Sequence, residues 1–99
     1  MKKVSIIIPC YNAEKFISQT IQSALSQDYG DIEVVAVDNE SKDSTYEILQ
    51  SFDDDRLKIS TAKNIHPFCW DEAREEGFKK ASGEYFFTLT ADDRDWETL

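Results

Sequence analysis

The stretch from residue 4 to residue 12, VSIIIPCYN, decides the fold class. Its first five residues, Val4 to Ile8, form a β-branched and largely apolar run that is typical of a parallel strand buried on both faces. Pro9 fixes its own φ and carries no amide hydrogen, so we expect the strand to end there. Asn12 then predicts the N-cap of the following helix.

Short apolar runs alternate with segments of helical spacing along the rest of the chain. Further strands are predicted at residues 33–37 (EVVAV), 57–60 and 85–89 (YFFTL), with helices at about 16–25, 44–52 and 70–81. Ser44 and Glu47 predict a capping box at the start of the second helix, and Gly83 predicts a C′ residue after the third. Because helical crossovers of this length join parallel strands, the order βαβαβαβ predicts an α/β fold: a doubly wound sheet with helices on both faces.

The composition bounds the function. The 99 residues suffice for one small domain, and a hydrophobic fraction of 40% supplies a core. A net charge of −9 disfavours nucleic acid as a partner. Cys10 and Cys69 are too far apart for a zinc site, and Cys10 is expected to be a small buried hydrophobe. No stretch is long enough for a signal peptide or a membrane span, which favours a cytoplasmic protein.

Ligands of doubly wound sheets bind beyond the carboxyl ends of the strands, so the residues that follow each strand are the candidates. Asp92 and Asp93 follow the fourth strand. Two adjacent carboxylates repel each other unless they are solvated or bridged by a cation. They are either the ligands of Mg²⁺ or Mn²⁺, with a diphosphate on the same ion, or an ordinary acidic turn.

Three other positions have two readings each. Asp38 and Asn39 end the second strand and either contact a base or ribose or form an Asx turn. Tyr11 either stacks on a base or belongs partly to the core. Arg74 interrupts an apolar stripe and either extends outward to solvent or pairs with an anion. The absence of G-x-G-x-x-G and of a Walker loop disfavours dinucleotide oxidoreductases and P-loop NTPases.

Five motifs in order give the chain a specific resemblance. They are Pro9-x-Tyr11-Asn12, the string IQSALSQDY at residues 21–29, DNESKDST at residues 38–45, ASGEY at residues 81–85 and TADD at residues 90–93. The chain resembles the opening of family 2 glycosyltransferases throughout its length, with their P-x-Y-N, D-D-G-S-x-D-x-T, A-x-G-E-Y and D-A-D-D motifs.

The resemblance implies a Rossmann-like GT-A half-domain with a mainly parallel sheet that binds a nucleoside diphosphate sugar, UDP-linked by preference. It implies that the base and ribose contact Pro9, Tyr11 and Asp38, with Asn39 beside them. It places Arg74 near the nucleotide. Asp92 and Asp93 would hold Mn²⁺ or Mg²⁺, and Asp92 would also bind the nucleotide sugar. The implied reaction is inverting, metal-dependent sugar transfer in cell wall or polysaccharide biosynthesis, to a sugar or lipid-linked acceptor.

Three departures from the family motifs bear on the donor. Asn39 replaces the second acid of D-D, Thr90 replaces the first acid of D-x-D, and Glu75 stands where the family commonly has Asn. These changes affect the identity of the donor more than the fold.

Residues 1–99 are expected to be the truncated N-terminal part of a longer, membrane-associated protein. The catalytic base lies in the family's acceptor half, so no catalytic residue is assigned. The chain alone is therefore expected to transfer no sugar and to form a homodimer through its fourth strand. The alternative function is a non-catalytic nucleotide-binding or interaction module.

Overall fold

The computed structural model describes residues 3–26, 31–63 and 71–88, with the side chains of residues 71–74 left out. The elements are β1 (Val4–Cys10), α1 (Ile17–Leu25), β2 (Ile32–Asp38), α2 (Thr45–Gln50), β3 (Leu57–Thr61), α3 (Asp71–Lys80) and β4 (Tyr85–Thr88). None of these helices combines the length and the hydropathy that a membrane crossing requires.

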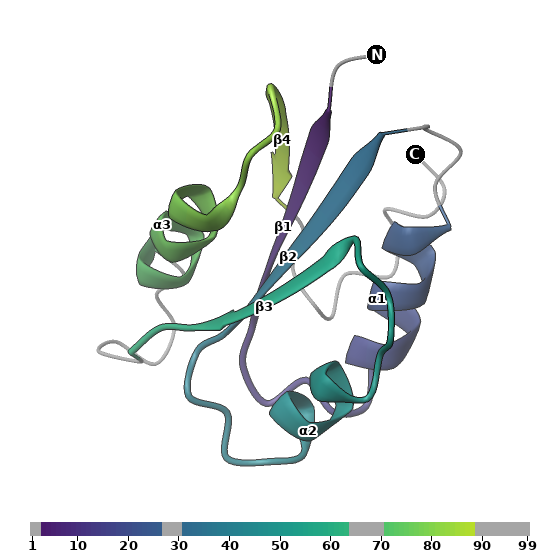
Figure 1. Ribbon diagram of the computed structural model, residues 1–99. Coiled ribbons are helices and arrows are strands. Elements are labelled where there is room, and N and C mark those ends of the chain that lie inside the picture. The colour runs from purple at the N-terminus through teal and green to yellow at the C-terminus, as the bar shows by residue number, and fades with distance from the viewer. Residues whose placement is uncertain (1–2, 27–30, 64–70, 89–99) are drawn as a thin grey trace.

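The four strands form one parallel sheet in the order β3-β2-β1-β4. Helix α3 lies on one face, in contact with β1, β2 and β3, whereas α1 and α2 lie on the other face against β2 (Figure 1). The doubly wound α/β arrangement predicted from the alternation of elements is therefore confirmed. The register aligns Cys10 of β1, Asp38 of β2 and Thr61 of β3 at one edge of the sheet.

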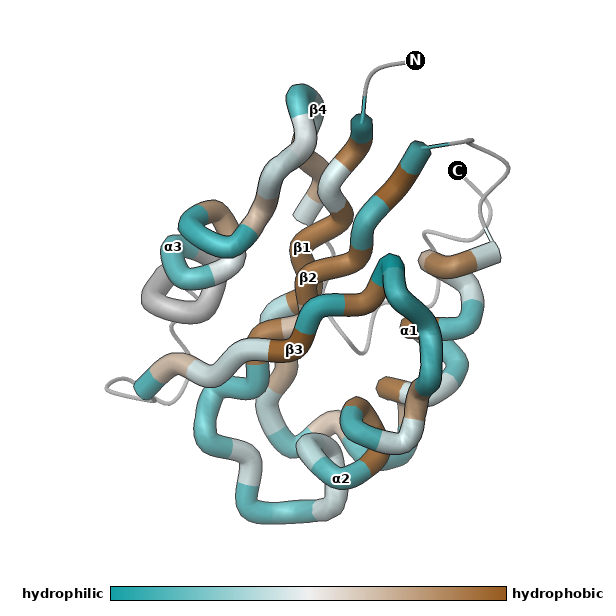
Figure 2. Tube along the Cα trace, viewed as in Figure 1, coloured by the Kyte–Doolittle hydropathy of each residue, from teal (hydrophilic) through white to brown (hydrophobic). Residues whose placement is uncertain are grey.

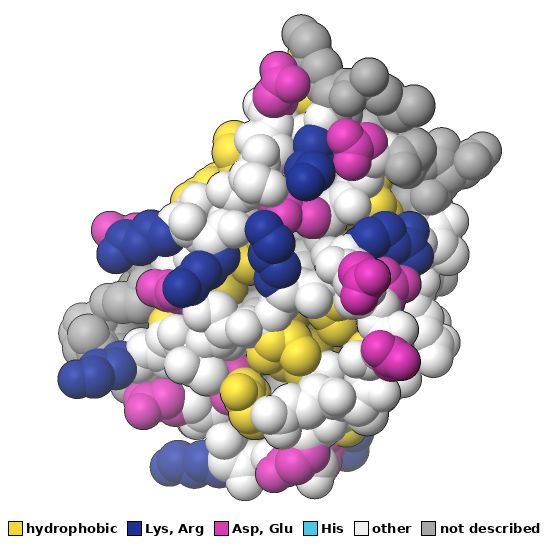
Figure 3. All heavy atoms as spheres, viewed as in Figure 1, with side chains coloured by type: hydrophobic (Ala, Val, Ile, Leu, Met, Phe, Trp, Pro, Cys, Tyr) yellow, Lys and Arg dark blue, Asp and Glu magenta, His cyan; other side chains and the backbone are white. Residues whose placement is uncertain are grey.

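The core divides between the two faces of the sheet because successive strand residues point to opposite sides. Ile6, Ile8, Val34 and Ala36 pack with α1 and α2, and Ile7, Val35 and Val37 pack on the opposite side with Ala62 and Ala81. Every residue of β1 and β2 is buried, and hydrophobic colour concentrates on these two central strands (Figure 2). Between β3 and α2, hydrophobic side chains reach the surface (Figure 3).

The prediction that Pro9 ends the first strand is wrong. Strand β1 continues through Cys10, and Pro9 pairs in register with Val37. The Val4 amide donates to Asp31 O and Cys10 O accepts from the Asn39 amide, so even-numbered residues of β1 bond to β2. The nitrogen of Pro9 therefore faces the β4 side, where the described pairing stops at Ile7 and Thr88. The missing amide hydrogen thus removes no bond from the β1–β2 ladder.

The predicted N-cap of α1 is wrong, and that of α2 is right in position but lacks the predicted capping box. The N-cap of α1 is Phe16, without a side-chain cap bond, and Asn12 instead has a left-handed φ of 49° and accepts a hydrogen bond from the Lys42 amide. The N-cap of α2 is Ser44, as expected, but no side-chain cap bond is made. The carboxylate of Asp43 takes that role by accepting from the amide of Thr45.

Two glycines allow close approaches between elements. A Cβ on Gly77 of α3 would overlap Cγ2 of Ile7, so this helix lies directly on β1. Gly83 has no positive φ, which corrects its predicted role as a C′ residue. A Cβ on Gly83 would lie 2.5 Å from Ser5 Oγ and 2.9 Å from Lys3 O. The segment between α3 and β4 therefore passes against β1 at a distance that only glycine permits.

Glu33 anchors that segment from within the sheet. Its buried carboxylate accepts hydrogen bonds from Ser5 Oγ at 2.5 Å and from the Ser82 amide, and it pairs with Lys58 Nζ at 2.8 Å. The amide of Gly83 in turn donates to Ser5 Oγ at 2.9 Å. Burial alone would raise the pKa of Glu33, but the bonds from Lys58, Ser5 and Ser82 outweigh it and lower the pKa from 4.5 to about 2.

We predict that Glu33→Gln destabilises the fold at neutral pH. A pKa lowered from 4.5 to about 2 stabilises the fold above pH 4.5, and that contribution is lost as the pH falls toward 2. The shift corresponds to roughly 3 kcal/mol of unfolding free energy. Urea titrations at pH 7 and pH 3 measure it, and the difference between wild type and variant should shrink at pH 3.

Asp54→Asn is the matched control, because Asp54 also has a pKa lowered to about 2, by Arg56, but lies on an exposed turn. An exposed pair contributes little to stability. Equal losses in the two variants at pH 7 would contradict the structural role of Glu33.

Candidate functional site

The carboxyl ends of the strands place the loops after β1 and β2 side by side. Cys10 and Asp38 are register partners, and the Asn39 amide donates to Cys10 O at 2.7 Å. The Ala62 amide, just past β3, donates to Asp38 O at 3.0 Å. Asp38 and Asn39 therefore lie at the centre of this edge, between the ends of β1 and β3.

Asp38 forms the predicted Asx turn, and its contact with a base or ribose stays a prediction. The side chain is buried, with 4% of the residue surface exposed. Oδ2 accepts from the Ser41 amide at 3.2 Å, as in a turn stabilised by an aspartate. Oδ1 is buried and has no hydrogen-bond partner among the described residues. A carboxylate oxygen in this state costs free energy until a donor reaches it.

Asn39 presents a second buried acceptor. Its residue surface is 2% exposed, and its Oδ1 likewise lacks a partner within the described ranges. Adjacent residues of one strand end thus hold two unsatisfied oxygens at the ligand-binding edge of a doubly wound sheet. Buried polar groups in native proteins are almost always hydrogen-bonded. The arrangement therefore suits a ligand that supplies N–H or O–H donors, such as a base or a ribose.

The other first-strand candidates differ in exposure. Pro9 is fully buried within the sheet, and Tyr11 is partly exposed just beyond it. Cys10 is a buried free thiol that donates to Ile8 O at 3.3 Å. Burial, and then the charge of Asp38, raises the pKa of the Cys10 thiol well above its ordinary value. Cys10 is thus the small buried hydrophobe that was expected, and it remains neutral.

The remaining predicted residues are not placed by the structure. Asp92 and Asp93, the candidate metal ligands, lie outside the described residues, and so does Thr90. Arg74 belongs to α3, but its side chain is among those left out. Within residues 3–26, 31–63 and 71–88, no group of three or more histidine, cysteine or acidic side chains is arranged to hold a metal ion.

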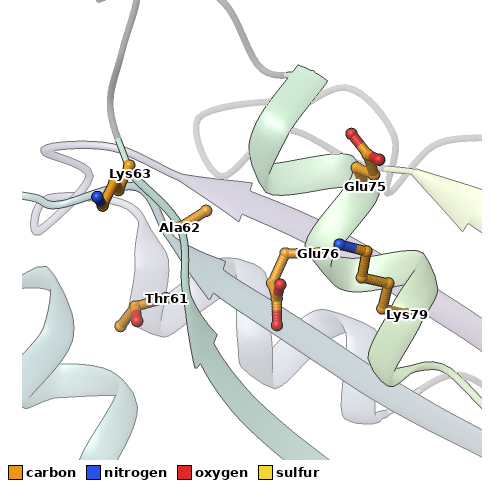
Figure 4. A pocket seen from close by; sticks show the side chains of 6 residues that line it. All are labelled: Thr61, Ala62, Lys63, Glu75, Glu76 and Lys79. Atoms are coloured by element: carbon orange, nitrogen blue, oxygen red, sulfur yellow. The ribbon is translucent and has the colours of Figure 1, made fainter.

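A hollow of about 300 Å³ opens between the end of β3 and α3 (Figure 4). It is lined by Thr61, Ala62, Lys63, Glu75, Glu76 and Lys79. Glu76 is held in place by the hydroxyl of Ser60 at 3.1 Å. Of the six residues that line the hollow, only Glu75 stood out in the sequence, as a departure from a family motif. The rule that selects residues just after a strand would have found Ala62 and Lys63 as well.

The two loops also bond to each other through side chains that sequence analysis did not treat as functional. The Asn12 amide donates to Ser41 Oγ at 2.9 Å, and the Ala13 amide donates to Thr45 Oγ1 at 2.8 Å. The signal in the sequence was that Ser41 and Thr45 lie inside DNESKDST, while Asn12 ends P-x-Y-N and Ala13 follows it.

The sequence pattern described as glycosyl transferase family 2 matches residues 5–95. This match covers most of the chain. The chain belongs to glycosyl transferase family 2. Its similar curated relatives include an uncharacterised glycosyltransferase of Haemophilus influenzae, 40% identical over 94% of this chain and 37% of the relative. Another is an Escherichia coli UDP-Glc:α-D-GlcNAc-diphosphoundecaprenol β-1,3-glucosyltransferase, 40% identical over 94% of this chain and 36% of the relative. The chain thus spans about a third of the length of these relatives.

Solved structures give the same fold. Staphylococcus aureus TarS 1–349 in complex with UDP superposes with a TM-score of 0.80 and 32% identity over 91% of this chain and 27% of that chain. The mannosyltransferase PcManGT of Pyrobaculum calidifontis, in complex with GDP-Man and Mn²⁺, superposes with a TM-score of 0.78. It is 25% identical in sequence, over 95% of this chain and 30% of that chain. These neighbours are GT-A glycosyltransferases, so the Rossmann-like GT-A assignment from the motifs is confirmed.

Proposed function

We propose that this chain is the donor-binding part of an inverting, metal-dependent glycosyltransferase that uses a UDP-sugar. The observation that carries the proposal is the pair of buried, unpartnered oxygens, Asp38 Oδ1 and Asn39 Oδ1, at the carboxyl edge of the sheet. Uracil and ribose supply the N–H and O–H donors that these acceptors lack. Tyr11 is partly exposed and directly follows Cys10, the register partner of Asp38, and we assign it to stacking on the base. The UDP named for TarS and the UDP-Glc named for the Escherichia coli relative support uridine over guanosine.

The diphosphate end of the donor is assigned to residues beyond β4. Asp92 and Asp93 follow this strand, and their hard oxygen ligands suit Mn²⁺ or Mg²⁺. PcManGT, solved with GDP-Man and Mn²⁺, supports such an ion in the family. A divalent ion held by Asp92 and Asp93 would supply positive charge to stabilise the departing diphosphate. Arg74 of α3 would add positive charge near the nucleotide.

The acceptor half of the reaction is assigned to sequence beyond these 99 residues. A carboxylate base there would deprotonate the acceptor hydroxyl. The Escherichia coli relative is named for an undecaprenol-linked acceptor, which favours a lipid-linked acceptor and work at the cytoplasmic face of a membrane.

We predict Mn²⁺-enhanced binding of UDP by calorimetric titration, stronger than that of GDP. Asp92→Ala with Asp93→Ala should abolish the enhancement, because the carboxylates that bridge the ion to the diphosphate are lost. The control is Asp53→Ala with Asp55→Ala, which removes the same charge from an exposed turn. An enhancement that survives in the Asp92 and Asp93 variant would rule out the metal assignment.

We predict that Asp38→Ala weakens the binding of UMP and of UDP by the same factor, roughly 10- to 100-fold. The reason is that a charged hydrogen bond to the nucleoside is lost. Isothermal titration with both nucleotides measures this, with Asp55→Ala as the control. A loss confined to UDP would place Asp38 at the diphosphate instead.

We also propose that the isolated chain pairs with a second copy through β4. Among the described residues β4 is an edge strand of the sheet, and β1 is the strand with which it pairs. Phe86 and Phe87 are 45% and 61% exposed, and Phe86 packs edge-on against Phe78 of α3. An edge strand beside an apolar patch favours pairing with an identical strand, and a two-fold dimer covers the patch in both copies.

We predict a concentration-dependent dimer in light scattering between micromolar and millimolar protein. Phe87→Lys should shift the chain to monomer, because a charge on an edge strand opposes pairing. Lys79→Glu, on the exposed side of α3, is the control and should leave the dimer intact. A wild-type chain that stays monomeric over this range would exclude the dimer.

A further inference from the structure

The loops after β1 and β2 are joined by a set of reciprocal hydrogen bonds, here named the loop clamp. It comprises residues 12–14 and 41–45. The amides of Asn12, Ala13 and Glu14 donate to side chains of the second loop, and the amides of Lys42 and Ser44 donate to side chains of the first. Each loop therefore provides both donors and acceptors to the other.

Asp43 is the centre of the loop clamp. Its Oδ1 accepts from the amide of Thr45 at 2.9 Å and from the Thr45 hydroxyl at 2.5 Å, and its Oδ2 accepts from the Glu14 amide at 3.2 Å. The Thr45 hydroxyl, oriented by Asp43, accepts from the Ala13 amide at 2.8 Å. Burial would raise the pKa of Asp43, but the bonds from Thr45 and Glu14 outweigh it and lower the pKa. The ionised carboxylate thus holds both loops.

The loop clamp leads directly to the candidate nucleotide site. Ser41 Oγ accepts from the Asn12 amide, and the Ser41 amide donates to Asp38 Oδ2 at 3.2 Å. That bond leaves Asp38 Oδ1 as the oxygen without a partner in the described part of the chain. Movement of the second loop would therefore rotate the Asp38 carboxylate and displace its open oxygen.

The backbone beside the clamp requires such support. Asn12 and Glu40 have left-handed φ values of 49° and 56°. This conformation is unfavourable for a residue with a Cβ and persists only where the surrounding contacts hold it. Glu40 stands at the glycine position of the family's D-D-G-S, so here the contacts must hold what glycine would adopt freely.

We infer that Asp43 is a positioning residue for the nucleotide site: through Thr45 and Glu14 it fixes the loops that carry Tyr11, Asp38 and Asn39. The consequence for affinity rests on the proposed function, whereas the effect on loop geometry does not. The side chain of Asp43 acts on the ligand only through these loops.

The test compares Asp43→Asn, Thr45→Val and Thr45→Ser with wild type. Asparagine cannot accept at both ends, and valine removes the hydroxyl at nearly equal volume, whereas serine retains it. In the free protein, amide hydrogen exchange at Asn12, Asn39 and Ser41 should accelerate in Asp43→Asn and Thr45→Val but not in Thr45→Ser. The Kd for UDP should rise about tenfold in the same two variants, as for other residues that orient a ligand-binding group.

Asp54→Asn is the control for removal of a carboxylate, and exchange within β1 reports whether each variant keeps its fold. If Asp43→Asn fails to fold, the threonine pair still decides the question. Unchanged exchange and unchanged UDP affinity in both clamp-breaking variants would overturn the inference. If wild type binds no UDP or GDP, the proposed function fails, and the exchange data alone decide whether Asp43 positions the loops.

Discussion

The parallel pairing of β1 with β2, in the register that aligns Cys10 with Asp38, is the constraint on which the rest of the structure depends. Both strands are buried on both faces, so a shift by one residue would exchange the two halves of the core. The same register brings the two following loops together. The register therefore sets the separation between the backbones of Tyr11 and Asp38 independently of the contacts between the loops.

The polar groups at the amino ends of the strands and those at their carboxyl ends differ in how they are hydrogen-bonded. At the amino-terminal side, Glu33, Ser5 and Gly83 hold the segment that enters β4. The bond between Ser5 and Glu33 is buried and the other two are partly buried, and together they satisfy the polar groups of this anchor. At the carboxyl edge, Asp38 and Asn39 each keep one oxygen without a partner within the described residues. The polar groups at the amino ends of the strands are thus bonded to each other, whereas two acceptor oxygens at the carboxyl ends are not bonded within the described residues.

The charge pattern at the candidate site bears on donor choice. Asn39 retains a buried acceptor oxygen but removes the second charge of the family's D-D pair. Two adjacent buried carboxylates would repel each other, so the substitution lowers the cost of burying Asp38. The hollow beside α3 carries both lysine and glutamate side chains, and the face in Figure 3 likewise mixes charges of both signs. The net charge of −9 is therefore compatible with local positive groups near an anionic ligand.

The sequence by itself determined the element order, the parallel sheet and the candidate edge, because strand and helix periodicity and crossover rules are local properties. The motifs also identified the family. The tertiary structure decided the contacts between residues far apart in sequence, which rules based on local periodicity cannot predict. Pro9 remains in its strand because its missing amide hydrogen removes no bond from the β1–β2 ladder. Asn12 does not cap α1 but accepts from Lys42, thirty residues away in sequence. Asp43 caps the start of α2 and also accepts from Glu14, 29 residues away. The partners of Glu33 come from β1, β3 and the segment before β4, and only the folded chain brings such distant groups within hydrogen-bond distance.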